Sequence, residues 1–171
     1  MTEKIPIFLS VGEPHNDVQK QYLDEIIQYF SNNNISAETL GRTFWSIKNP
    51  LEPIQNKMTH VHGACILAME RFQSLNGCYK RGSEHESLKN VQYFASIWTQ
   101  LEAAMAYQEE LPLLIFKEEN LVAEGMFDGQ IHGWMVVRIN PENPSEINQG
   151  PIKKYIDSWI EEVRCHYYCN L

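Results

Sequence analysis

The side chain best placed to do chemistry is the carboxyl group of Glu102, within the stretch 93–106. Large apolar residues in and just before this stretch are spaced by three and four, which predicts a helix with one core-facing stripe, at positions 91, 94, 98, 101 and 105. Glu102 would project about 60° from the centre of that stripe, one turn from Trp98 and Ala106. A carboxylate in such a place is partly desolvated, which disfavours its charged form unless a partner or a ligand is present. The alternative is that the Glu102 side chain extends to solvent at the edge of the buried face of the helix.

The helix that carries Glu102 leads into a short apolar run, Leu111–Phe116, with a proline at its second position. A run of this length and character is typical of a buried parallel strand. We therefore expect the Glu102 helix to run directly into a central strand of a sheet.

The residues around Glu102 resemble two related families. The segment Ser96-Ile97-Trp98-Thr99-Gln100-Leu101-Glu102 resembles the Ser-x-Trp-Cys-x-x-Glu signature of TIR domains, with Thr99 in the usual cysteine position. Glu102, Ala106 and Pro112 also resemble the Glu-x3-Ala-x5-Pro spacing of nucleoside 2-deoxyribosyltransferase-like proteins. In TIR enzymes this glutamate cleaves NAD, and in the second family it attacks or stabilises an anomeric carbon. Both families break N-glycosidic bonds.

The TIR resemblance spans most of the chain, is specific around Ser96–Glu102, and implies a bacterial defence type of domain. It implies an NAD glycohydrolase or cyclase with Glu102 as the catalytic residue, NAD as substrate and no separate cofactor. The ADP-ribose product would serve as a signal in antiviral defence, and the protein would form a homo-oligomer or a TIR-type assembly. The alternatives are a deoxyribosyltransferase-like N-glycosidase and a non-enzymatic module for nucleotide binding or assembly.

Further substrate-binding candidates lie where strands are expected to end. An apolar strand, Ile5–Gly12, contains Ser10 and finishes in small residues, and Gly12 would let the backbone turn sharply. Ligands of open α/β sheets sit at this carboxyl edge, although an ordinary strand-to-helix turn is the alternative. Arg71 falls at the carboxyl end of the third expected strand, 63–71. Ser96 and Trp98 complete the set beside Glu102.

Two connections are also candidates for ligand contact. The connection 41–50 is longer than a turn between a strand and a helix requires, and it is rich in aromatic and cationic residues. Trp45 could therefore stack on a base, and Arg42 could bind a phosphate. TIR domains use the corresponding loop to cover nucleotide and to contact neighbouring subunits, and packing of these aromatics on the domain itself is the alternative. The segment 73–89 has no hydrophobic period and is expected to be a loop above the same edge. Its positive charge at 79–81 suits an anionic ligand or, alternatively, a solvated loop.

Composition limits the classes of protein that the chain can belong to. With 171 residues, 43% hydrophobic and 21% charged, it suits one globular domain over residues 1–171. The net charge of -8 argues against a nucleic-acid partner. No long apolar run or signal sequence is present, so we expect no membrane partner and a cytoplasmic location. The four cysteines lack zinc-site spacing, which predicts reduced thiols and no metal site.

Strand and helix patterns alternate along the whole chain. Strands are expected over 5–12, 35–40, 63–71, 111–116 and 134–139, and helices over 16–32, 50–60, 93–106 and from about 151 onward. This alternation predicts an α/β fold, specifically a three-layer flavodoxin-like domain with a mostly parallel sheet of about five strands flanked by helices.

Overall fold

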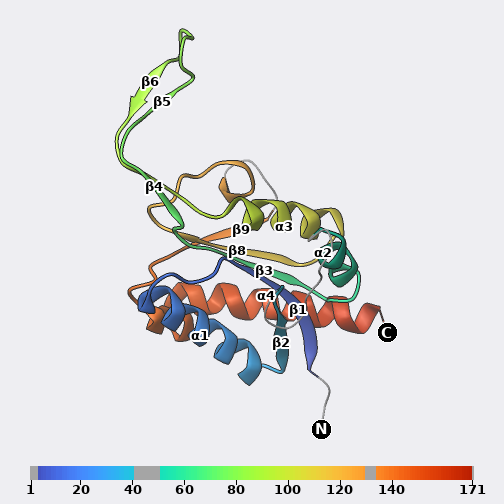
Figure 1. Ribbon diagram of the computed structural model, residues 1–171. Coiled ribbons are helices and arrows are strands. Elements are labelled where there is room, and N and C mark those ends of the chain that lie inside the picture. Colours follow the sequence, from blue (N-terminus) through green and yellow to red (C-terminus); the bar gives the residue numbers. More distant parts are fainter. Residues whose placement is uncertain (1–3, 41–50, 130–133, 171) are drawn as a thin grey trace.

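A parallel β-sheet organises the structure, a computed structural model that describes residues 4–40, 51–129 and 134–170 (Figure 1). Within these residues the sheet has five strands in the order β2-β1-β3-β8-β9, and every neighbouring pair is parallel. The strands are β1 (Ile5–Val11), β2 (Ile35–Glu38), β3 (Ala64–Ala68), β8 (Leu113–Glu118) and β9 (Met135–Ile139). The predicted α/β fold with a parallel sheet is confirmed, and the strand order is that of flavodoxin-like domains.

Helices cover both faces of the sheet and make three layers. Helices α1 (Asp17–Asn32) and α4 (Gly150–Cys169) lie on one face, and α2 (Leu51–Met58) and α3 (Ile97–Gln108) lie on the other (Figure 1). Side chains alternate along β1 accordingly, because successive residues of a strand point to opposite faces. Ile7 and Leu9 join the core under α1 and α4, whereas Phe8 packs with residues of α2 and α3.

The helices α1 and α4 form where their sequence patterns predict. The side chain of Asn16 accepts a hydrogen bond from the backbone N–H of Gln19 at 2.8 Å and caps α1. The buried face of α4 consists of Ile156, Trp159, Ile160 and Val163. Two apolar residues of these helices, Val18 and Tyr155, are exposed, since they lie beyond the width of each buried face.

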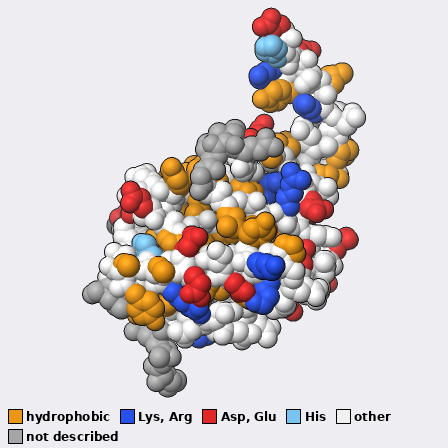
Figure 2. Space-filling view, turned by 180° about the vertical axis from the view of Figure 1, so that it is seen from behind, with side chains coloured by type: hydrophobic (Ala, Val, Ile, Leu, Met, Phe, Trp, Pro, Cys, Tyr) orange, Lys and Arg blue, Asp and Glu red, His pale blue; other side chains and the backbone are white. Residues whose placement is uncertain are grey.

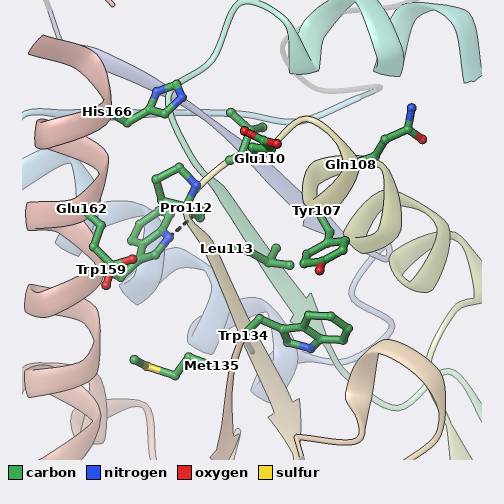
Figure 3. A pocket seen from close by; sticks show the side chains of 11 residues that line it. Tyr107, Gln108, Glu110, Pro112, Leu113, Trp134, Met135, Trp159, Glu162 and His166 are labelled. Carbon is green, nitrogen blue, oxygen red and sulfur yellow. Dashed lines mark hydrogen bonds between the residues drawn. The ribbon is translucent and has the colours of Figure 1, made fainter. Parts of the chain in front are cut away.

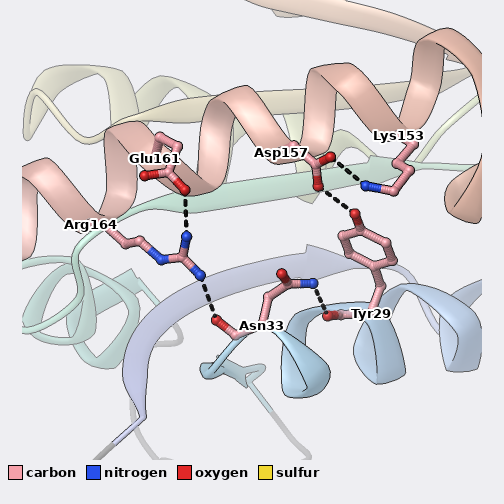
Figure 4. Close-up of polar contacts among 6 residues, drawn as sticks. All are labelled: Tyr29, Asn33, Lys153, Asp157, Glu161 and Arg164. Carbon is pink, nitrogen blue, oxygen red and sulfur yellow. Dashed lines mark hydrogen bonds and ion pairs between the residues drawn. The ribbon is translucent and has the colours of Figure 1, made fainter.

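Polar contacts join α1 to α4 beside their shared core (Figure 4). The hydroxyl of Tyr29 donates to the carboxylate of Asp157, which also pairs with Lys153. One helical turn beyond the middle of α4, Arg164 donates to the carbonyl oxygen of Asn33 at 3.2 Å. This carbonyl lies just after the last residue of α1, where backbone acceptors have no intrahelical partner, so Arg164 caps the end of α1.

The helix that carries Glu102 differs from the prediction in its start and in its buried face. It begins at Ile97, because Ser96 accepts a hydrogen bond from the backbone N–H of Trp98 and forms the N-cap. Trp98 and Leu101, predicted to face the core, are each 43% exposed. The buried residues of α3 are Thr99, Glu102, Ala103 and Ala106. Because α3 is apolar on both sides, the spacing of its large residues could not show which side is buried.

The predicted loop over 73–89 is wrong, since this region forms β-structure. Strands β4 (Phe72–Ser74) and β7 (Gln92–Phe94) pair antiparallel, and β5 (Gly77–Tyr79) pairs with β6 (Ser87–Lys89) beyond them. We call residues 72–94 the arm, because Figure 1 shows that β5 and β6 at its far end project well away from the sheet. Alternating hydrophobicity marks a strand only when one face is buried, and the strands of the arm have no fully buried residue.

The remaining findings concern the membrane, the thiols and the segment 41–50. Among the described helices, none combines the length and the apolar character needed to cross a bilayer. All four cysteines are free thiols, and Cys65 is buried in the core. The segment 41–50, with the candidate residue Trp45, lies outside the described residues.

Close packing of α4 on the sheet makes Gly63 a sensitive position. A Cβ atom added there would lie 2.5 Å from Cγ2 of Val163 and 3.1 Å from Cζ2 of Trp159. Gly63→Ala should therefore lower the free energy of unfolding by about 1–3 kcal/mol through overpacking, measured by denaturant titration. The control Gly77→Ala places its Cβ 3.9 Å from the nearest side-chain atom and should change stability little. An equal loss in a Val163→Ala background, where the clash is relieved, would contradict this account.

Candidate functional site

A cavity of about 650 Å³ lies at the carboxyl ends of β1 and β3. From β1 the chain goes to β2 on one side, and it returns to β3 on the other side of β1. The loops that follow β1 and β3 therefore diverge, and ligands of open α/β sheets bind in the crevice between such loops. The walls come from these two loops, the end of β2 and the first turns of α3, and include Gly12, Thr39, Arg71, Trp98 and Glu102.

Glu102 enters this cavity from the buried face of α3. Only 8% of the residue is exposed. The hydroxyl of Ser10, itself fully buried on β1, donates a hydrogen bond to Oε2 of Glu102. Ser10 faces α3 because it lies two residues after Phe8, whose side chain packs on the same side of the sheet. The contact thus joins a central strand to a helix 92 residues later in the chain.

The surroundings of Glu102 favour its protonated form. Burial raises the pKa of the Glu102 carboxyl above its ordinary value, and the hydrogen bond from Ser10 opposes this rise in part. Among the described residues, no ion pair joins Glu102 to a cationic side chain. A carboxyl group in this state can accept hydrogen bonds from a bound molecule, and a positive charge brought close to it would draw off its proton.

Five of the six predicted substrate-binding residues come together here. Gly12, Arg71, Ser96 and Trp98 line the cavity, and Ser10 reaches it through Glu102. The sixth, Trp45, lies outside the described residues.

The local roles of Gly12 and Ser96 differ from those expected. Gly12 has no positive φ, and a Cβ atom there would lie 4.0 Å from that of Ser96, so the predicted need for glycine in a sharp turn is wrong. Ser96 uses its hydroxyl oxygen to cap α3. Arg71 is exposed at the rim, and no carboxylate in the described part of the chain forms an ion pair with it.

Sequence reasoning missed several residues of the cavity wall. Thr39 lies just after the end of β2, Phe72 begins the arm, and Glu13 follows Gly12 in an exposed position. Thr99 is almost fully buried and donates through Oγ1 to the carbonyl oxygen of Ser96 at 2.5 Å, which supports the first turn of α3. The rule that ligands sit at the carboxyl edge could have identified Thr39, whereas Phe72 gave no signal because the arm was not recognised.

Side chains at the carboxyl edge hold the loops around the cavity in place. Gln19 in α1 donates to the carbonyl oxygen of Glu70 at 2.8 Å and accepts from the backbone N–H of His15 at 3.3 Å. The backbone N–H of Glu70 in turn donates to Oε2 of Glu118 at 2.8 Å. These contacts tie the loop after β1 and the loop after β3 to the end of β8. The rim that carries Arg71 is therefore fixed by hydrogen bonds on both sides.

A second cavity, of about 710 Å³, lies at the opposite end of the sheet (Figure 3). Two of its polar side chains are engaged within the protein, and one of these is Trp159, whose Nε1 donates to the carbonyl oxygen of Pro112 at 3.0 Å. Nδ1 of His166 lies 3.2 Å from Nδ1 of His62. The two carboxylates of this cavity, Glu110 and Glu162, are exposed. The smaller cavity is therefore the better candidate, because it combines the topological position with a buried carboxyl group.

Comparisons with known proteins do not identify the site. No protein-family model matches the chain, and no curated protein matches its sequence. In the described residues, no three His, Cys, Asp or Glu side chains are grouped so that they could hold a metal ion. The function must therefore be argued from the geometry and chemistry of the cavity.

Neutralising Glu102 should make the unliganded protein more stable at neutral pH. The pKa of Glu102 is higher in the folded state than its ordinary value of 4.5. The free energy of unfolding therefore falls as the pH rises from 4.5 through the raised pKa. Glu102→Gln keeps a hydrogen-bond acceptor for the Ser10 hydroxyl and cannot ionise, so its free energy of unfolding does not fall in this pH range. Its melting temperature should exceed that of the wild type by a few degrees at pH 7 (about 2–4 °C for each kcal/mol), and the gain should shrink below pH 4.5. The matched control is Glu13→Gln, an exposed carboxylate of the same cavity, which should have little effect. A Glu102→Gln gain that did not depend on pH would contradict burial of the charge as its cause.

Proposed function

We propose that the protein cleaves the N-glycosidic bond of NAD or a related nucleotide, with Glu102 as the catalytic residue. The observation that carries the proposal is one buried carboxyl group that accepts a hydrogen bond from Ser10. It lies in the cavity between the diverging loops that follow β1 and β3. A carboxylate against a ribose can stabilise the positive charge that develops at the anomeric carbon, or can attack that carbon. Neither role requires a metal ion.

The reaction needs only groups that the cavity offers. As the bond between C1′ and the nicotinamide nitrogen breaks, its electron pair goes to the ring and leaves an oxocarbenium-like ribose. Water then adds to C1′ and loses a proton, which yields ADP-ribose, whereas attack by another nucleophile of the same molecule would yield a cyclic product. Ser10 holds the Glu102 carboxyl in one orientation throughout. Loss of the Glu102 proton when the pyridinium ring binds nearby places a negative charge where the cation forms.

Other groups of the cavity suit the rest of a dinucleotide. Arg71 supplies a cation at the rim, and the amino end of α3, which carries the positive end of the helix dipole, faces the same cavity through Ser96 and Ile97. Both favour the phosphates of a nucleotide. Trp98 is 43% exposed and offers an indole face on which a base can stack. The volume of about 650 Å³ is within the usual range of small-molecule sites.

The second candidate is a deoxyribosyltransferase-like N-glycosidase, in which Glu102 attacks the sugar of a nucleoside. The cavity favours NAD over this substrate for a chemical reason. A purine or pyrimidine leaves as an anion unless an acid protonates it, whereas nicotinamide leaves as a neutral molecule. Glu102 is the only buried carboxyl group among the described residues of the cavity wall, and it is already used at the anomeric carbon. A leaving group that needs no acid is therefore the better match.

A third candidate is a non-enzymatic module that binds a nucleotide or assembles with partner domains. The burial of Glu102 argues against it, because a buried carboxyl group that has no ion-pair partner among the described residues costs stability and contributes nothing to affinity for anionic phosphates. The resemblance to TIR domains adds a biological role to our proposal, in which the ADP-ribose product acts as a signal in antiviral defence in the cytoplasm. That role rests on the resemblance alone.

Product analysis distinguishes the three candidates. The purified protein is incubated with NAD and, separately, with a panel of deoxynucleosides, and the products are identified by mass spectrometry. Free nicotinamide together with linear or cyclic ADP-ribose supports the proposal. Free base from deoxynucleosides alone would favour the second candidate. Nucleotide binding without any product would favour the third.

Replacing Glu102 by glutamine should lower turnover of NAD by about 10²–10³-fold, because the charge that stabilises the transition state is lost. Nucleotide affinity should change less than turnover, since in the ground state the positive charge is on the pyridinium ring and it develops at C1′ only in the transition state. The measurement is the rate of nicotinamide release together with calorimetric binding. Glu13→Gln removes an exposed carboxylate from the same cavity and should change turnover less than about threefold. Equal turnover in the wild type and Glu102→Gln would dispose of the catalytic assignment.

The acid limb of the pH–rate profile should report the Glu102 carboxyl. Its pKa is raised by burial, so kcat/KM should rise with pH through a midpoint above 4.5. Ser10→Ala removes the hydrogen bond that lowers this pKa, so the midpoint should move to a higher pH. A midpoint that does not move in Ser10→Ala would show that another group controls the limb.

A further inference from the structure

In the part of the chain that the structure describes, the exposed large apolar side chains are concentrated in two places. Of the thirteen large hydrophobic side chains that are exposed among the described residues, nine lie on the arm or on α3. Five belong to the arm, and they are Phe72, Leu75, Tyr79, Leu88 and Val91. Four belong to α3, and they are Ile97, Trp98, Leu101 and Tyr107. Exposed large apolar side chains that gather on the same elements are typical of interaction sites.

The arm lacks the support that a two-stranded ribbon needs. Each of its strands is three residues long, and isolated hairpins of this size are marginally stable in water. Its base is held through Tyr93, whose carbonyl oxygen accepts a hydrogen bond from the backbone N–H of Val122 at 3.0 Å. Beyond that base the arm projects away from the described α-helices α1, α2, α3 and α4 (Figure 1). Leu88, near the end of the ribbon, is 84% exposed.

The outer face of α3 is unusual for a helix that covers a sheet. Ile97, Leu101 and Ala104 lie at helical spacing on the side opposite the buried residues, and all three are exposed. A helix that is apolar on both sides is normally buried on both sides. The arm of the same molecule cannot cover this face, because the ribbon leads away from α3 (Figure 1).

We infer that the arm docks on the outer face of α3 of a second copy of this chain. The two apolar surfaces occur once each on every copy, so a two-fold dimer buries both arms and both α3 faces at the same time. From Phe72 to Arg81 the arm can span about 30 Å at 3.3 Å per residue, which is the width of a small domain. Its reach is therefore sufficient to lie across a neighbouring molecule.

Charge also favours the body of a second copy over another arm. The arm carries three cationic side chains, Lys80, Arg81 and Lys89, and two carboxylates, Glu84 and Glu86. Since the whole chain has a net charge of -8, the remainder carries -9. In Figure 2 hydrophobic, cationic and acidic side chains alternate along the arm. With a net charge of +1, the arm is better matched in charge by the acidic body of a second copy than by another arm of the same sign.

The first test is the oligomeric state of full-length variants by sedimentation velocity over a range of concentrations. The wild type should dimerise, and Leu88→Asp in the arm or Leu101→Asp on α3 should weaken the dimer by about 100-fold. Val18→Asp is the matched control, because Val18 is 41% exposed on α1 and lies outside both surfaces. Circular dichroism confirms that each variant is folded. A wild type that stays monomeric up to about 100 µM, or a dimer that Leu88→Asp leaves intact, would overturn the inference.

A mixing experiment tests which surface meets which. In an equimolar mixture, the Leu88→Asp copy has an intact α3 face and the Leu101→Asp copy has an intact arm. One of the two contacts can then form, so the mixture should dimerise more tightly than either variant alone. Lack of any recovery would overturn the pairing of arm with α3, and would instead indicate that like surfaces meet. A monomeric wild type that floats with anionic lipid vesicles would likewise overturn it, in favour of a membrane surface.

Discussion

The contact between Ser10 on β1 and Glu102 on α3 is the interaction on which the rest of the site depends. It places a carboxyl group where little water reaches it, so the group is held by one hydroxyl and by its surroundings. Taking a carboxylate out of water is costly, and proteins keep such a group when something else is gained. Here the gain we propose is an electrostatic partner for a sugar cation, which is effective because the dielectric around it is low.

The local sequence of α3 explains how this contact is reached. The N-cap at Ser96 sets the first turn, and Thr99 strengthens it by bonding back to the Ser96 carbonyl. From that start, Glu102 falls on the inner face together with Ala103 and Ala106, which have small side chains. Small residues let the helix approach the sheet closely. The carboxyl group of Glu102 therefore reaches β1 instead of solvent.

The fold was predictable from sequence to a greater extent than the details of the site. Alternating strand and helix patterns gave the sheet and its flanking helices, because each buried strand is a short apolar run between amphipathic segments. The arm was missed since strands with no buried face leave no periodic signal. The buried side of α3 was wrongly predicted because its two sides are similarly apolar, although Glu102 itself was singled out. Arg71 was placed at the carboxyl edge by a rule of topology, and Glu102 and Trp98 were singled out by helical spacing and a motif resemblance. The hydrogen bond to Ser10 could not be predicted, because it depends on how β1 and α3 are positioned against each other.

The most direct test of this account is the titration of the Glu102 carboxyl in the folded, unliganded protein. Carbon-13 NMR of protein labelled in its glutamate carboxyls would give the midpoint, with Glu102→Gln to assign the signal. We predict a midpoint above the ordinary value of 4.5, and a further rise in Ser10→Ala. A Glu102 carboxyl that titrates at its ordinary value, or that does not respond to the loss of the Ser10 hydroxyl, would contradict the claim that the cavity holds a desolvated carboxyl group ready to meet a cation.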